Sequence, residues 1–242
     1  MDARHEDTRS PHSTGVPVAT TLCRIAQKAR SEPELRFVNL FHLLKVELLR
    51  QCFRGLRGDA APGIDEVTKE AYAQNLEDNL AALERRLHQM SYRPQPVRRV
   101  YIPKPGTDKQ RPLGIPVLED KRVQAAMVRV MEPIYEQEFI EDSYGFRPGR
   151  SCHHALRALS DTVERGDIEW IVEADIKGFF DHVNHDPLMQ FLSRRLGDPR
   201  MQRMVKRFLI AGVTEDGAFQ ASDEGTPQGG VMTLPTILQI MS

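Results

Sequence analysis

The chain has 242 residues, 40% of them hydrophobic and 28% charged, with a formal net charge of -1 at pH 7. This composition suits one or two ordinary domains with a real core and excludes a chain that is disordered throughout. No run approaches the roughly 18 to 20 apolar residues of a membrane span, and the polar amino terminus lacks the apolar region of a signal peptide. We therefore expect a cytoplasmic protein without membrane contact, whose three widely spaced cysteines are reduced.

The first third of the chain reads as helices separated by a Gly-Pro break. Residues 1–30 are polar and contain several Ser, Thr and Pro, which predicts a flexible tail followed by a marginal helix. Apolar residues at three- and four-residue spacing predict amphipathic helices over residues 34–53 and 69–90. Between them, GDAAPGIDEVT at residues 58–68 interrupts the helical pattern.

Prolines and alternating apolar residues mark residues 94–116 as extended chain and turns. Between Arg85 and Arg111, eight Lys or Arg residues stand against one acid, although the whole chain is nearly neutral. A dense basic stretch with Tyr92 and Tyr101 interleaved suits a phosphate backbone, because each neutralised phosphate releases counterions. A merely solvated surface is the alternative that charge alone leaves open.

The second half alternates helices with short extended segments. Helices are predicted over residues 119–139, over 151–165 with Ser151 as a possible cap, and over 186–210 with a break near Gly197 and Pro199. From Gly212, turn residues and short β-prone stretches indicate a hairpin with Asp216-Gly217 at its tip.

Residues 168–175 alternate in a way that predicts a buried strand, with Trp170 and Val172 on one face and Asp175 on the other. A carboxylate at the end of such a strand can hold a divalent metal, since Mg²⁺ takes one or two carboxylates together with substrate phosphates and waters. A helix cap or turn residue is the alternative for a lone Asp at a strand end.

Four motifs occur in this order: KPGTDKQRPLGIPVLEDKRVQ, YGFRPGRSCHHAL, EADIKGFFDHVNHDPLM and GTPQGG. Together they resemble the blocks of group II intron reverse transcriptases, the intron-encoded maturases. The upstream APGID and YRPQPVRRVYIPK resemble the family's amino-terminal blocks, so the resemblance covers about residues 35–231. The YGFRPGRSCHHAL block favours this type over the reverse transcriptases of retrons or CRISPR arrays.

The resemblance implies an α+β fold, the fingers and partial palm of a right-hand polymerase, with helices packed on a small antiparallel sheet and no thumb. It implies a flexible tail over residues 1–30, an amino-terminal extension and fingers over 31–140, and fingers with a truncated palm over 141–242. The expected activity is RNA-directed DNA polymerisation with a maturase role in splicing. The expected partners are an RNA template or intron RNA, a DNA primer and deoxynucleoside triphosphates.

The resemblance also assigns catalytic and nucleotide-binding residues. Asp175 matches the first catalytic, metal-binding Asp of the palm, and the Ile176 carbonyl lies close to the same Mg²⁺ in the family. Phe180 matches the aromatic residue that packs against the incoming sugar and selects deoxynucleotides. Lys104 and Arg111 match the residues that grip the triphosphate, for which a point charge and a guanidinium fork are suited.

Further residues are expected at the nucleotide pocket and on the nucleic acid. Gln228 matches the nucleotide-pocket residue of the PQGG block, and Gly229 lets the backbone approach the template and primer closely. Arg98 and Arg99 of the basic stretch are candidate RNA contacts. Arg147 and Arg150 are candidate RNA-phosphate contacts as well, with loop packing as their alternative role.

The expected metal site is incomplete in these 242 residues. Polymerase chemistry uses two ions roughly 3.5 to 4 Å apart, and the family's other carboxylates come from a Tyr-x-Asp-Asp hairpin after PQGG. The residues after Gly230, VMTLPTILQIMS, contain no Asp or Glu, and neither Glu173 nor Asp181 is expected to replace them. We therefore expect a truncated copy without polymerase activity of its own. A non-catalytic RNA-binding remnant and a chain that does not fold stably are the other hypotheses.

Overall fold

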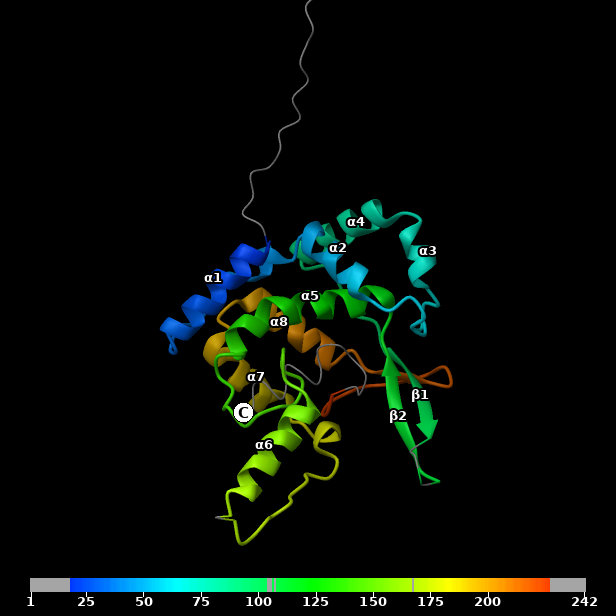
Figure 1. The fold of residues 1–242 in the computed structure, drawn as a ribbon. Helices are drawn as coiled ribbons and strands as arrows, with labels where there is room; N and C mark the ends of the chain where they lie inside the picture. The colour runs from blue at the N-terminus through cyan, green and yellow to red at the C-terminus, as the bar shows by residue number, and fades with distance from the viewer. Residues whose placement is uncertain (1–17, 104–105, 107, 167, 227–242) are drawn as a thin grey trace, which may run out of the picture.

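The computed structural model describes residues 18–103, 106, 108–166 and 168–226, and its core is built by helices (Figure 1). The α-helices are α1 (Val18–Ser31), α2 (Val46–Gly55), α3 (Lys69–Ala73), α4 (Leu76–His88), α5 (Leu118–Tyr135), α6 (Cys152–Glu164), α7 (His185–Arg195) and α8 (Pro199–Leu209). Two short 3₁₀ helices are η1 (Phe41–Leu43) and η2 (Phe179–Asp181), and the strands are β1 (Val97–Pro103), β2 (Gln110–Ile115), β3 (Val213–Glu215) and β4 (Ala218–Gln220).

Helix α5 lies at the centre of the core. Val123, Met127, Val130 and Ile134, spaced by four, three and four residues, are fully buried along it. Helices α1 and α2 pack against α5, and α7 and α8 lie on its other side (Figure 1). One cluster of buried side chains runs from Ala29 to Leu209, so helices far apart in the sequence share a single apolar interior.

The sheet lies beside the helices and contains four strands in the order β2-β1-β3-β4. Strand β1 pairs antiparallel with β2, and β3 pairs antiparallel with β4. Because β3 runs parallel to β1, the sheet is mixed and not purely antiparallel as expected. The β3–β4 hairpin has Asp216 and Gly217 at its tip, both with positive φ, as a two-residue primed turn requires, which confirms the predicted hairpin.

The helix expected over residues 34–53 is wrong in its first half, because α2 begins only at Val46. The backbone before it is bonded elsewhere. The Asp198 carboxylate accepts the N–H groups of Leu40 at 2.7 Å and Phe41 at 2.8 Å, and Phe37 exchanges backbone hydrogen bonds with residues 195 and 197. Backbone donors used in this way are not available for a continuous helix.

The helix expected over residues 69–90 is interrupted. Helix α3 ends at Ala73 and α4 begins at Leu76, with Asn75 in a non-helical conformation between them. The other expected helices are present: α1 after the tail, α5, and α6 with Ser151 accepting a hydrogen bond from the His154 N–H as its cap. The predicted break near Gly197 separates α7 from α8.

The buried strand expected over residues 168–175 is wrong. This segment forms no strand among the described residues, and Trp170 and Val172 are 85% and 89% exposed. Alternation identifies a strand only where a neighbouring strand is present, since an isolated strand gains neither ladder hydrogen bonds nor a covered face. None of β1 to β4 pairs with it.

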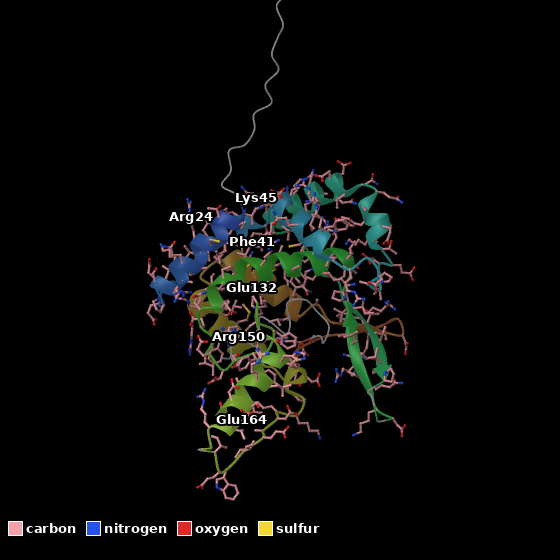
Figure 2. The ribbon with its side chains drawn as sticks, viewed as in Figure 1. Arg24, Phe41, Lys45, Glu132, Arg150 and Glu164 are labelled. Atoms are coloured by element: carbon pink, nitrogen blue, oxygen red, sulfur yellow. The ribbon has the colours of Figure 1, made fainter. Side chains whose placement is uncertain are left out.

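Helix α6 projects from the helical core on the same side of the molecule as residues 168–175 (Figure 1). None of its residues is buried, and Figure 2 labels Glu164 at its end and Arg150 shortly before its start. The three cysteines carry free thiols, and of these only Cys52 is buried. Among the described residues, no helix combines the length and the hydropathy needed to cross a bilayer.

Candidate active site

A cavity of about 330 Å³ lies where β1, β2 and β3 meet two segments of the carboxy-terminal half. Residues 222–226 form one of these segments, and Asp181 at the end of η2 represents the other. The wall of the cavity consists of Val97, Arg99, Pro112, Gly114, Asp181, Val213, Ser222, Glu224, Gly225 and Thr226. The cavity therefore combines the basic strands with the segments that hold the EADIKGFFD and GTPQGG motifs.

Backbone hydrogen bonds hold these two motif segments together across more than forty residues of sequence. The Thr226 N–H donates to the Phe180 carbonyl at 2.8 Å, and the Gly225 N–H donates to the Val183 carbonyl at 2.9 Å. The His185 ring Nε2 lies 2.7 Å from the Gly225 carbonyl. Phe180 is therefore fixed next to the residues that immediately precede Gln228, which itself lies outside the described residues.

Gly225 makes this close approach possible. Its φ is +73°, in the left-handed region, and a Cβ atom there would lie 2.5 Å from the Asp181 carbonyl oxygen and 3.1 Å from that of Phe180. A larger residue would push the two segments apart. The first Gly of the GTPQGG motif is thus required by packing.

Strand β1 carries the two predicted RNA-binding arginines, Arg98 and Arg99. Arg99 lies 3.6 Å from the Glu215 carboxylate, and Tyr101 donates to the same carboxylate at 2.5 Å, which raises the pKa of that phenol. Arg98 donates to the Pro62 carbonyl at 2.7 Å and so ties the APGID loop to β1. Arg99 lines the cavity, whereas Arg98 mainly holds the strand in place.

A second, wider cavity of about 720 Å³ adjoins these arginines. It lies between the APGID loop and the β3–β4 hairpin, and both Arg98 and Arg99 line it. Gly63 in its wall packs against α5, where a Cβ would lie 2.5 Å from the Val117 Cα. Arg99 therefore lines both cavities, whereas Arg98 lines only the wider one.

Asp175 and Ile176 lie apart from the first cavity. Both are exposed, and among the described residues no hydrogen bond or ion pair involves the Asp175 carboxylate. The Ile176 carbonyl accepts the Phe179 N–H at 3.3 Å, in a turn that Gly178 completes with φ +66°. One carboxylate and one carbonyl suit a single Mg²⁺ that also takes waters and phosphates, and the described residues contain no cluster of three or more His, Cys, Asp or Glu side chains for a metal.

The nucleotide-binding residues expected from the motifs are only partly described. Phe180 is half-buried and packs edge-on against Phe179, with ring centres 5.1 Å apart. Arg111 is exposed on β2, opposite Ile102 of β1, and does not line the first cavity. Lys104, Gln228 and Gly229 lie outside the described residues.

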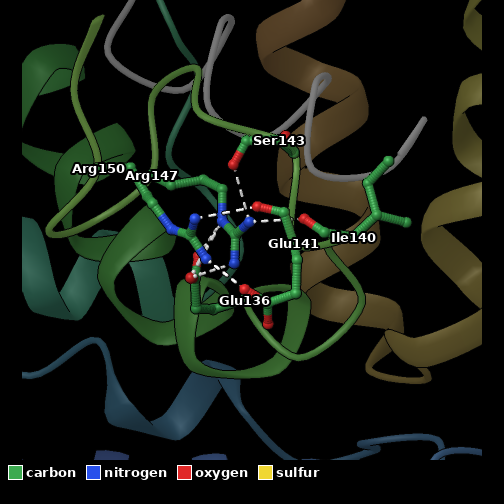
Figure 3. A network of polar contacts seen from close by, with 6 residues as sticks. All are labelled: Glu136, Ile140, Glu141, Ser143, Arg147 and Arg150. Atoms are coloured by element: carbon green, nitrogen blue, oxygen red, sulfur yellow. Dashed lines mark hydrogen bonds and ion pairs between the residues drawn. The ribbon is translucent and has the colours of Figure 1, made fainter. Parts of the chain in front are cut away.

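Arg147 is occupied by contacts within its own loop (Figure 3). Its guanidinium forms an ion pair with Glu136 at 2.8 Å and donates to the carbonyls of Ile140 and Ser143, each at 2.9 Å. It also stacks over the Phe139 ring at 4.4 Å, and only 6% of the side chain is exposed. These contacts favour the loop-packing role that the sequence left open.

Arg150 is bound in the same loop but less tightly. Its guanidinium pairs with the Glu141 carboxylate at 2.7 Å and donates to the Glu141 carbonyl at 3.0 Å (Figure 3). The Glu141 side chain is almost fully exposed, so water competes for this pair. Arg150 keeps some access to solvent.

Two acidic residues on the cavity wall were not predicted as site residues. The sequence predicted that Asp181 would not replace the missing metal ligands, and it predicted no role for Glu224. Glu224 also lies 3.3 Å from the His182 ring. Their position depends on the contact between residues 180–185 and 224–226, which no local sequence pattern indicates.

The reverse transcriptase (RNA-dependent DNA polymerase) family model matches residues 102–242, more than half of the chain. The chain belongs to this family. The match includes β2, η2 and all residues of the first cavity except Val97 and Arg99. Both the fold and the order of motifs are therefore those of a reverse transcriptase.

Similar proteins agree with the group II intron type. Protein YkfC of Escherichia coli (strain K12) is 41% identical over 227 residues, which cover 90% of this chain and 58% of YkfC. The group II intron-encoded protein LtrA of Lactococcus lactis subsp. cremoris is 35% identical over 221 residues, which cover 90% of this chain and 36% of LtrA. The resemblance to group II intron reverse transcriptases is confirmed, and the chain spans only part of the length of both relatives.

A solved structure confirms the fold class. A chain of a partial Cas6-RT-Cas1–Cas2 complex superimposes with a TM-score of 0.54 at 21% identity, covering 82% of this reverse transcriptase chain and 32% of that chain. At this identity the similarity concerns the fold. Helices packed beside a small sheet, as in the fingers and palm of a polymerase, are thus confirmed.

Proposed function

We propose that this chain supplies the fingers and the first part of the palm of a group II intron-type reverse transcriptase, which copies RNA into DNA and assists splicing. The observation that carries the proposal is the cavity in which Arg99 of β1 meets the segments of Phe180 and Gly225. Its proposed ligands are an RNA template, a DNA primer and a deoxynucleoside triphosphate. The cytoplasmic location and the domain boundaries at residues 30 and 140 stay predictions.

Within this proposal, Asp175 and the Ile176 carbonyl hold one Mg²⁺, which supplies Lewis-acid stabilisation of a phosphate oxygen when bound. Lys104 and Arg111 bind the triphosphate, Phe180 excludes a 2′-hydroxyl, and Gln228 and Gly229 complete the pocket. The 242 residues contain no Tyr-x-Asp-Asp. We therefore propose that they do not extend a primer by themselves.

A chimera tests the polymerase role. The matched stretch of LtrA is replaced by this chain, and primer extension on an RNA template is measured with Mg²⁺. We expect extension that Asp175→Asn abolishes, together with increased use of ribonucleotides by Phe180→Ala, because the steric barrier to the 2′-hydroxyl is removed. Extension that Asp175→Asn leaves unchanged would overturn the assignment of Asp175 as a catalytic residue. Extension by the 242 residues alone, lost on Asp175→Ala, would overturn only the inactivity of the isolated chain.

The second candidate is a non-catalytic RNA-binding remnant, and the wide cavity beside Arg98 and Arg99 favours it. Backbone binding requires positive charge and no metal, so it predicts salt-sensitive RNA binding that persists in EDTA. Charge reversal at Arg99 should weaken it with little effect on folding, since this side chain is partly exposed. Undetectable RNA binding at low salt would rule it out.

A further inference from the structure

Helix α8 presents a stripe of basic side chains on the side opposite its buried face. Arg200, Arg203 and Arg207 follow one another at i, i+3 and i+7, which places them along one side of a helix. The buried face consists of Met201, Met204, Val205, Phe208 and Leu209. The helix contains no Asp or Glu, so nothing within it neutralises the stripe.

A fourth arginine, Arg93, joins the stripe from another part of the chain. Arg207 donates to the Met90 carbonyl at 3.0 Å and to the Tyr92 carbonyl at 2.8 Å, which fixes its guanidinium beside Arg93. Lost hydration lowers the pKa of Arg207, and the neighbouring charges of Arg93 and Arg203 lower it further. Arg93 and Arg203 therefore lie close enough for their charges to repel that of Arg207.

Several basic residues elsewhere in the chain have acidic partners, as in Arg86 with Glu119 and Arg99 with Glu215. Throughout the described ranges, no ion pair involves Arg93, Arg200, Arg203 or Arg207. A solvated face of flexible lysines would relax by moving its charges apart. Here Arg207 is half-buried and held by two carbonyls, so its charge stays beside the exposed guanidinium groups of Arg93 and Arg203.

We propose that the stripe of Arg93, Arg200, Arg203 and Arg207 binds the phosphates of RNA, as a contact surface separate from the copying cavity. None of the four residues lines that cavity. Guanidinium forks suit phosphate oxygens better than ammonium groups do, and four of them in a row suit a polyanion. The choice of RNA over an acidic protein or an anionic membrane rests on the proposed function.

The test is RNA binding by the 242-residue chain in EDTA, without nucleotides, over a series of salt concentrations. A labelled RNA hairpin is the probe, and the variant is Arg93→Gln, Arg200→Gln, Arg203→Gln, with Arg207 kept because it bonds the backbone. Each lost phosphate contact removes about 0.7 to 0.9 from the slope of log affinity against log salt. We expect a slope smaller by about 2 to 3. An unchanged slope would overturn the proposal.

The matched control removes the same number of positive charges outside the stripe, through Arg24→Gln, Arg30→Gln, Arg157→Gln. Its slope of log affinity against log salt should equal that of the parent chain. Equal losses in both triple variants would show a non-specific charge effect and reject the stripe. Arg203→Glu alone, with an unchanged melting curve, repeats the test if the triple variant is unstable. Binding to phosphatidylserine vesicles that depends on these arginines, without binding to RNA, would also reject the proposal.

The outcomes separate this surface from the proposed polymerase. If the chimera fails to extend a primer but the stripe variant still shows the smaller slope of log affinity against log salt, the proposed function alone is wrong. If extension in the chimera depends on Asp175 and the stripe variant binds RNA as the parent chain does, this surface alone is wrong.

Discussion

Among single residues, Arg147 distinguishes packing from RNA binding most clearly. Substitution by Lys keeps the charge but cannot make the paired contacts to Glu136 and to two carbonyls. We expect Arg147→Lys to lower the free energy of unfolding by about 2 to 4 kcal/mol, since buried partners are left unpaired. RNA affinity should not change. Chemical denaturation and the hairpin binding assay measure both effects.

Arg150→Lys is the matched control, because its pair with exposed Glu141 is screened by water, and its substitution should lower the free energy of unfolding much less than Arg147→Lys does. A variant at Arg147 that folds with full stability but loses RNA affinity would restore Arg147 as an RNA contact.

Asp120, also at the residue scale, links stability to pH. Its carboxylate accepts from Tyr92 at 2.5 Å and from the Gln95 N–H at 2.9 Å, while burial raises its pKa to about 7. Glu119 and Asp65 raise it further. Between about pH 4 and 7 the unfolded chain releases a proton that the folded chain keeps. As the pH rises through this range, the free energy of unfolding should therefore fall by up to about 1.4 kcal/mol per pH unit.

Asp120→Asn removes this titration but keeps an acceptor for Gln95 and a donor for Tyr92. Urea denaturation at several pH values should show a flatter pH profile for the variant than for the parent chain. Parallel profiles would contradict a raised pKa at Asp120. Tyr92 does not interfere, because burial and Asp120 raise the pKa of its phenol well above the usual value.

Among the elements, the junction between α8 and residues 34–45 depends on one carboxylate. Asp198 accepts the N–H groups of Arg200 and Met201 as the cap of α8 and also those of Leu40 and Phe41. We expect Asp198→Ala to cost about 3 to 5 kcal/mol, since four backbone donors lose their acceptor. Thermal and chemical denaturation measure this loss.

Asn184→Ala is the control for this prediction, since Asn184 accepts, among the described residues, only the Asp186 N–H at the start of α7. It should cost about 1 kcal/mol. Equal losses for the two caps would show that the bonds to Leu40 and Phe41 contribute nothing.

Local sequence signals predicted the elements whose hydrogen bonds and caps come from residues nearby in the sequence. The helices α5, α6, α7 and α8 follow from apolar spacing and caps, and the β3–β4 hairpin follows from Asp216-Gly217. The prediction for residues 34–45 failed because their backbone partners lie far away in the sequence, and the prediction for residues 168–175 failed because no described strand pairs with them. The motifs identified the Phe180 and GTPQGG segments separately, but their contact, like the positions of Asp181, Glu224 and the stripe on α8, depends on three-dimensional packing. The roles of Phe180 and Gln228 in nucleotide binding stay predictions.

At the scale of the whole molecule, stability is distributed unevenly. Helix α5 lies inside the common core, whereas α6 has no buried residue. We expect hydrogen exchange of α6 amides to occur by local opening that denaturant hardly affects, while α5 amides exchange through global unfolding. Equal protection of the two helices would contradict a separately opening α6.

The exposed segment before Asp175 also contains the chain's only tryptophan, Trp170. Its fluorescence therefore has a single source, five residues from the proposed metal ligand. An indole surrounded by water should emit at long wavelength and be quenched readily by iodide. Any polypeptide or RNA that covers this segment would shift the emission to shorter wavelength and block the quencher. The natural sequence thus carries a site-specific optical probe that needs neither label nor substitution.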